Sequence, residues 1–171
     1  MKSLQTLTAS AFLMAVSAIP GTSAILVYNV NLNGTQSGTG SPATGTATVT
    51  VDDILNSVGV SLSFSGLTGG PATAAHIHCC VAPGANGPVV IPFTGFPNAT
   101  SGTYSNTFTG ISAANIAGIE AGQSYINIHD ATFPGGEIRG QITPEPATLA
   151  SLGLGMAVLL GARARRKRQA A

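Results

Sequence analysis

The stretch YINIHDATFPGGEIRGQI, residues 125–142, holds the densest mixture of strand pattern, turn residues and ionisable side chains in the sequence. Apolar and polar residues alternate on both sides of a central FPGG, which is the period-2 signature of strands buried on one face. Proline fixes φ in this turn, and glycine tolerates the positive φ that a tight reversal needs. We therefore predict a β-hairpin with one apolar and one polar face.

One register of this hairpin keeps both apolar sets on the core side and fixes the pairing of the polar residues. The expected neighbours are Tyr125 with Gln141, Asn127 with Arg139, and His129 with Glu137. Glu137 and Arg139 stand two apart on one strand. We interpret them as a surface ion pair worth under ~1 kcal/mol rather than as a substrate clamp.

Upstream of the hairpin, alternating segments predict six further short strands separated by Gly, Pro, Ser and Asp turns. The expected strands are residues 25–32, 43–51, 58–64, 73–79, 88–93 and 103–109. Residues 112–120 have helical spacing, with Ser112 as N-cap, and predict one short helix. Seven or eight strands with turns about every ten residues indicate an all-β, antiparallel, immunoglobulin-like β-sandwich. We read residues 52 and 53, two aspartates, as a solvated turn.

The hairpin, together with AAHIHCC at residues 74–80, GPVV at 87–90 and GTATVTV at 45–51, resembles the CHRD domain. This module is repeated in chordin and found in many secreted bacterial proteins, and the resemblance spans roughly residues 25–143. Two positions depart from the family pattern. Cys79 and Cys80 replace a Gly-Pro-like turn after the H-x-H, and Asp130 replaces a Thr after the hairpin histidine. The resemblance implies a non-enzymatic interaction module.

Charge is distributed unevenly along the 171 residues, of which 8% are charged. Residues 25–143 contain five acids and a single base, Arg139. An acidic body without a basic, aromatic-interleaved surface argues against nucleic acid as a partner. A body of this size buries a core without needing disulfides.

The first residues have the features of a secretory signal peptide. An apolar run at residues 9–19 follows Lys2 and ends in PGTSA, with small residues placed for a cut after Ala24. A buried N-terminal helix fits less well, because the run is short, lacks an amphipathic stripe and ends in Pro-Gly. We expect residues 1–24 to be removed on export.

The last residues combine a proline motif, an apolar run and a basic cluster. Residues 147–162 rise only ~24 Å as a helix, so snorkelling arginines must help this expected transmembrane helix to span the bilayer. The flanking residues are Pro144, Glu145 and Pro146 before the run and Arg163, Arg165, Arg166, Lys167 and Arg168 after it.

This tripartite end, residues 144–171, resembles the PEP-CTERM sorting signal of Gram-negative bacteria that typically make exopolysaccharide. The resemblance implies an exosortase-type sorting protease as a partner, with the chain anchored in the inner membrane by its C-terminal helix before processing. The positive-inside rule keeps the basic cluster in the cytoplasm. A permanent anchor with an incidental Pro pair is the alternative.

Three histidines are the candidate metal ligands. His76 and His78 are two apart on one expected strand, so they project from the same face. If that strand neighbours the hairpin, His129 and either Glu137 or Asp130 can meet them in a cluster of the type that copper or zinc accepts. The alternative is that the imidazoles only hydrogen-bond across a polar sheet face.

Cys79 and Cys80 are adjacent, and three interpretations stay open for them. They can form a vicinal disulfide that shapes the following loop, add a soft thiolate to the histidine cluster, or remain free thiols.

We expect no catalytic residues, because neither a nucleophile elbow nor a phosphate loop is present. The expected function is an exported, non-enzymatic CHRD module at the cell surface or in the matrix, without a cofactor, whose partner is a surface polysaccharide or protein. The competing hypothesis is an extracellular copper or zinc protein using His76, His78 and His129. A carbohydrate-binding module is disfavoured, because the body has no Trp and few Tyr.

Overall fold

The structure is a computed structural model that describes residues 25–144. The expected signal peptide, transmembrane helix and basic cluster lie outside these residues. Within the described range, no helix combines the length and apolarity that crossing a membrane requires.

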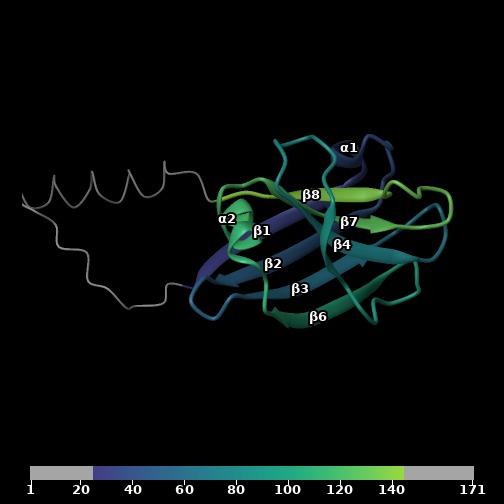
Figure 1. The fold of residues 1–171 in the computed structure, drawn as a ribbon. Helices are drawn as coiled ribbons and strands as arrows, with labels where there is room; N and C mark the ends of the chain where they lie inside the picture. Colours follow the sequence, from purple (N-terminus) through teal and green to yellow (C-terminus); the bar gives the residue numbers. More distant parts are fainter. Residues whose placement is uncertain (1–24, 145–171) are drawn as a thin grey trace, which may run out of the picture.

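Eight strands and two short helices make up the fold (Figure 1). In chain order they are β1 (Leu26–Asn33), α1 (Gly34–Ser37), β2 (Thr44–Asp52), β3 (Ser57–Ser65), β4 (Ala74–Cys79), β5 (Val89–Pro92), β6 (Gly102–Thr109), α2 (Ala113–Glu120), β7 (Ser124–His129) and β8 (Ile138–Ile142). The expected strands and the helix at residues 112–120 are confirmed. The helical turn α1 was not expected, because its sequence, GTQS, contains only loop-forming and short polar residues.

The strands pair antiparallel in one continuous sheet of order β5-β4-β7-β8-β1-β2-β3-β6. The all-β, antiparallel class is confirmed, but the two separate sheets of an immunoglobulin-like sandwich are not seen. Instead the sheet curls, nearly as a barrel, so that its β5-β4-β7-β8 half lies over its β1-β2-β3-β6 half. The two halves are joined through β8 and β1, whose ladder has a single paired position, Asn33 with Arg139.

Gly140 explains how β8 reaches β1 so closely. A Cβ at this position would lie 2.6 Å from a methyl of Val30 and 2.7 Å from the carbonyl oxygen of Asn31. Only glycine leaves room for the two backbones at the bend that connects the halves. The glycine in the second arm of the hairpin is therefore required by the curl of the sheet.

The core lies between the two halves and follows the predicted alternation. The β4-β7-β8 half contributes mainly isoleucines, including Ile77, Ile126 and Ile138, and the facing half contributes valines and aromatic residues. Phe93 stacks on Tyr104 and Phe108 near the open edge of β6. The polar side of the hairpin thus faces away from this core.

The hairpin has the predicted register, with Tyr125 opposite Gln141 and Asn127 opposite Arg139. β4 pairs with the other side of β7, which places His76 opposite Asn127 and His78 opposite Tyr125. The outward face of this half-sheet therefore carries the histidines in neighbouring positions.

Candidate metal centre

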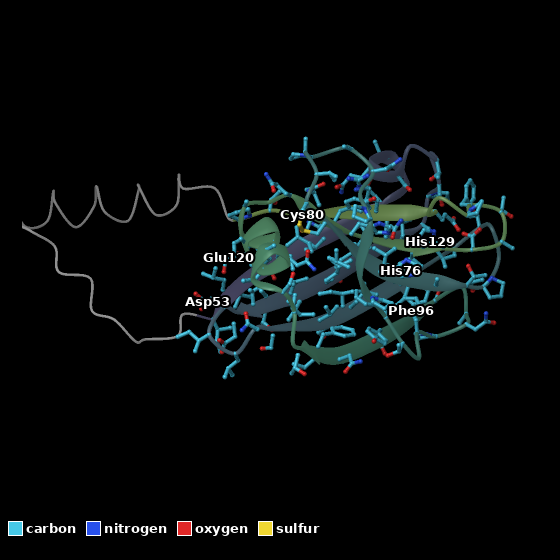
Figure 2. All side chains as sticks on the ribbon, viewed as in Figure 1. Asp53, His76, Cys80, Phe96, Glu120 and His129 are labelled. Carbon is cyan, nitrogen blue, oxygen red and sulfur yellow. A yellow bond between two sulfur atoms is a disulfide. The ribbon has the colours of Figure 1, made fainter. Side chains whose placement is uncertain are left out.

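His76 and His78 project from β4 and His129 from the end of β7, and the structure brings all three together. The ring of His129 lies 5.0 Å from that of His76 and 6.3 Å from that of His78, centroid to centroid. Figure 2 shows His76 and His129 side by side at the same end of the molecule. This is the geometry that the H-x-H spacing and the hairpin register predict.

Backbone carbonyls fix the tautomers of two of these imidazoles. Nδ1 of His78 lies 2.8 Å from the carbonyl oxygen of Gly87, and Nδ1 of His129 lies 2.8 Å from that of Pro134. A carbonyl only accepts, so both Nδ1 atoms must carry the proton, and each neutral ring keeps its lone pair on Nε2. Carbonyl contacts of this kind typically orient metal-binding histidines.

Ring nitrogens of all three histidines lie close together. Nε2 of His78 is buried and has no hydrogen-bond partner within residues 25–144. Nε2 of His129 lies 3.3 Å from Nδ1 of His76. One nitrogen from each of the three rings falls within 4.8 Å of the others. Metal–nitrogen bonds of about 2.0–2.1 Å then require the rings to close by roughly an ångström.

The surroundings favour uncharged imidazoles. Burial lowers the pKa of His76, and the charges of His129 and His78 lower it further. Burial also lowers the pKa of His129, although its hydrogen bond to the carbonyl of Pro134 opposes this. Neutral imidazoles are the form that binds a metal ion.

A stack of three side chains supports the cluster on one side. The ring of His78 lies parallel to that of Tyr125 at 4.7 Å, and the guanidinium of Arg139 lies 3.3 Å above the centroid of the Tyr125 ring. Arg139 is 6% exposed and Glu137 is fully buried. The expected surface ion pair between them is wrong, because the two side chains are held in different buried surroundings.

Neither expected carboxylate joins the histidines. Glu137 accepts hydrogen bonds from the Ser41 hydroxyl and from the backbone N–H groups of Thr68 and Gly69. Asp130 accepts from the N–H groups of Thr132 and Phe133, and it hydrogen-bonds Glu137. The two acids form a separate buried pair, which the residue pattern did not predict.

Cys79 and Cys80 form a vicinal disulfide in the structure. Their Sγ atoms lie 3.8 and 3.9 Å from the carbonyl oxygens of Asn115 and Ala114 in α2. The first of the three interpretations, a vicinal disulfide, is the one seen in the structure. The sulfurs contact α2 instead of the imidazoles, so the cluster consists of nitrogen donors.

The sequence profile of the CHRD domain matches residues 28–142, from the first strand to the last. The chain belongs to the CHRD family. The match covers the half-sheets and all three histidines of the cluster. No curated protein and no solved structure matches the chain.

A PEP-CTERM protein-sorting motif follows the CHRD domain directly, at residues 143–167. It indicates export with transient membrane anchoring, followed by display at the cell surface or release. The motif also implies processing by an exosortase, which is a membrane protease. Its residues from Glu145 onward lie outside the described structure.

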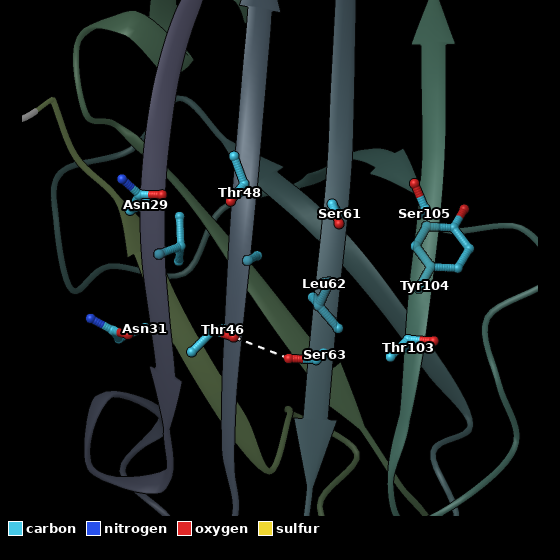
Figure 3. A pocket seen from close by; sticks show the side chains of 12 residues that line it. Asn29, Asn31, Thr46, Thr48, Ser61, Leu62, Ser63, Thr103, Tyr104 and Ser105 are labelled. Carbon is cyan, nitrogen blue, oxygen red and sulfur yellow. Dashed lines mark hydrogen bonds between the residues drawn. The ribbon is translucent and has the colours of Figure 1, made fainter.

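The opposite face of the CHRD domain carries a different kind of surface. An open hollow of about 610 Å³ lies over β1, β2, β3 and β6 and is lined by the exposed side chains of Asn29, Asn31, Thr46, Thr48, Ser61, Ser63, Thr103 and Ser105 (Figure 3). These side chains are hydroxyls and amides, and none is charged. Thr46 and Ser63 hydrogen-bond each other at 3.0 Å across two strands.

Proposed function

We propose that this CHRD protein is an exported metal-binding protein that holds one copper or zinc ion on His76, His78 and His129. The observation that supports the proposal is that one nitrogen from each of the three imidazoles lies within 4.8 Å of the others, while carbonyl hydrogen bonds orient two of the rings. A buried acceptor such as Nε2 of His78 normally has a partner, and a metal ion would supply it.

Donor chemistry favours copper over zinc. The cluster offers imidazole nitrogens without a thiolate or a carboxylate, and such sites bind divalent copper more tightly than zinc in the Irving–Williams order. His76 and His129 are only half-buried, which leaves a coordination position open toward solvent. The proposed role is binding rather than catalysis.

Metal content tests this proposal directly. We would purify the exported protein without a polyhistidine tag, strip it with a chelator, add copper or zinc and measure bound metal by mass spectrometry. We expect one ion per chain in wild type and less than a tenth of that in His76→Ala. Affinity should also fall as pH drops and the imidazoles take up protons.

The matched control is Asn31→Ala, which removes an exposed side chain on the opposite face. It should bind metal as wild type does. Circular dichroism must show that His76→Ala is folded. A folded wild-type protein that binds no metal, or a His76→Ala variant that binds as well as wild type, contradicts the metal centre.

The second candidate is the non-enzymatic interaction module at the cell surface, acting through the hollow of hydroxyls and amides on β1, β2, β3 and β6. Uncharged donors and acceptors in rows suit a neutral, hydroxyl-rich partner such as a surface polysaccharide. Substituting Thr46 and Thr48 by bulky charged residues should abolish retention on such a polysaccharide while leaving metal content unchanged. If the variant is retained on the polysaccharide as well as wild type is, this face is not the binding surface.

A further inference from the structure

A buried positive charge lies on the same sheet face as the histidines and is not one of the proposed metal ligands. The guanidinium of Arg139 donates to the carbonyl oxygen of Ala85 at 2.9 Å and to the side-chain oxygen of Asn86 at 3.2 Å. A longer contact of 3.4 Å reaches Gln141. All these acceptors are neutral, as is the Tyr125 ring below. Within residues 25–144, therefore, no carboxylate is bonded to this guanidinium.

A buried guanidinium bonded only to neutral acceptors lowers the stability of the fold unless an anion binds to it. Burying a charge without a counter-charge is unfavourable, and neutral acceptors compensate only in part. A guanidinium has five N–H donors, and the three contacts above leave two of them for another partner. The remaining donors are one on Nη1 and one on Nε, and a charge-assisted hydrogen bond from either of them suits a carboxylate oxygen. The missing partner is thus predicted to be a carboxylate.

The guanidinium lines a cavity that is large enough for such a partner. This cavity of about 310 Å³ is bounded by Arg139, Asn127, Tyr125, Asn86, Thr39 and the hairpin turn. Its volume is at the small end of the range for ligand pockets. None of the three histidines lines it, so it is separate from the proposed metal centre.

Asn127 adds a second specific feature to the cavity. It is 3% exposed and stands opposite Arg139 in the hairpin register. Its Nδ2 donates to the carbonyl of Gly135 at 3.3 Å, whereas its Oδ1 is buried without a partner in the described part of the chain. The side chain of Asn127 lines the cavity beside Arg139, and a hydroxyl of a bound ligand would supply the partner that its Oδ1 lacks. A ligand that fits both has a carboxylate and a neighbouring hydroxyl.

We propose that this cavity binds a small hydroxylated carboxylate, with its carboxylate on Arg139 and a hydroxyl donating to Oδ1 of Asn127. Two sources share this chemistry: a free hydroxy acid, and a uronic acid residue of an acidic polysaccharide. The proposal goes beyond metal binding and does not depend on it.

Titration of the exported, chelator-stripped protein with three probes tests the proposal, read by calorimetry. Glucuronate should bind saturably, and glucose, which lacks the carboxylate, should not. Lactate distinguishes the two sources of the ligand. If lactate binds as tightly as glucuronate, a free hydroxy acid is favoured. If it binds more weakly, a uronic acid is favoured. If neither glucuronate nor lactate binds better than glucose, the proposal is overturned, and this comparison needs no variant.

Two substitutions locate the site. Arg139→Gln keeps donors for the neutral acceptors but removes the charge, and we expect at least about a tenfold loss of glucuronate affinity. Asn127→Asp is nearly isosteric and places a carboxylate of the protein itself beside Arg139, so it should abolish glucuronate binding in a folded protein. Thr107→Ala, on the far strand β6, should bind as wild type. Unchanged affinity in Asn127→Asp excludes this cavity, and metal content stays an independent measurement.

Discussion

At the scale of single residues, the carboxyl groups of Asp130 and Glu137 form a buried pair. They are 2% and 0% exposed. Burial raises the pKa of Asp130, and its hydrogen bond with Glu137 raises it further. Burial alone would raise the pKa of Glu137 too, but hydrogen bonds from Asp130, Ser41 and Thr68 lower it to about 2. Of the two carboxyl groups, Asp130 therefore has the greater tendency to hold a proton and Glu137 the greater tendency to be charged.

These opposite shifts give stability an optimum in pH. The contribution of Glu137 is present above its unfolded-state pKa and is lost as pH falls toward about 2. That of Asp130 is present below its unfolded-state pKa and is lost as pH rises through its raised folded-state pKa. The carboxyl pair thus stabilises the fold best in mildly acidic solution.

Asp130→Asn is predicted to remove the loss on the alkaline side. The amide Nδ2 can still donate to Glu137, and the remaining oxygen can still accept from Thr132 and Phe133. Relative to wild type, the free energy of unfolding of this variant should increase as pH rises from about 4 to about 7. Urea unfolding followed by circular dichroism at several pH values measures it.

The control for this series is Asp53→Asn, in the exposed turn between β2 and β3. Its difference from wild type should vary far less with pH. A difference between Asp130→Asn and wild type that is constant across the pH range would falsify the raised pKa of Asp130.

At the scale of elements, local pattern was sufficient to predict the strands but not how the sheet closes. Alternation identified every strand within one or two residues, and the apolar sets fixed the hairpin register. The single ladder position between β1 and β8 depends on the close approach at Gly140, which has no local signature. For the same reason sequence alone did not distinguish one curled sheet from two separate ones.

In the candidate site, too, some features could be predicted from local pattern and others depended on tertiary structure. Residue spacing predicted that His76, His78 and His129 share a face, because strand geometry decides it. It did not predict that the loop after β4 covers part of this face, where Gly87 contacts both His78 and Tyr125. Those contacts come from a segment of Gly, Pro, Ala and Asn whose path is set by tertiary structure. Arg139 was misread as a surface residue for this reason.

The packing of α2 on the disulfide gives a prediction for one element. A Cβ on Gly118 would clash with the Sγ atoms of both Cys79 and Cys80. Gly118→Ala should therefore destabilise the protein by about 1–3 kcal/mol through overpacking, even though the same change in a helix interior otherwise stabilises by up to about 1 kcal/mol. Thermal or urea unfolding gives the value.

Ala117→Gly is the matched control, since Ala117 is exposed on the same helix. It should lose only about 0.5–1 kcal/mol, the cost of glycine in a helix. A Gly118→Ala variant that is more stable than wild type would show that α2 does not rest on the disulfide as described.

At the scale of the whole molecule, the fold and the sorting motif are arranged one after the other. The last strand ends at Ile142, and the sorting motif begins at residue 143. The first strand begins at Leu26, two residues after the predicted signal-peptide cut. Processing at both ends would therefore remove no strand, no part of the core and none of the three histidines.

Mass spectrometry of the protein recovered from the cell surface or the medium is expected to find chain ends near Ile25 and near Pro144. Glu145→Ala should instead accumulate in the membrane with its C-terminal segment retained, because the proline motif directs the sorting protease. Thr143→Ser, at an exposed position directly before Pro144, is the control and should be processed as wild type. Since the strands end before the cut, processed and unprocessed chains should unfold at the same temperature and bind the same amount of metal. Surface-displayed protein that still carries the arginines at residues 163–168 contradicts processing, whereas a loss of stability on processing means that the segment beyond Pro144 contributes to the fold.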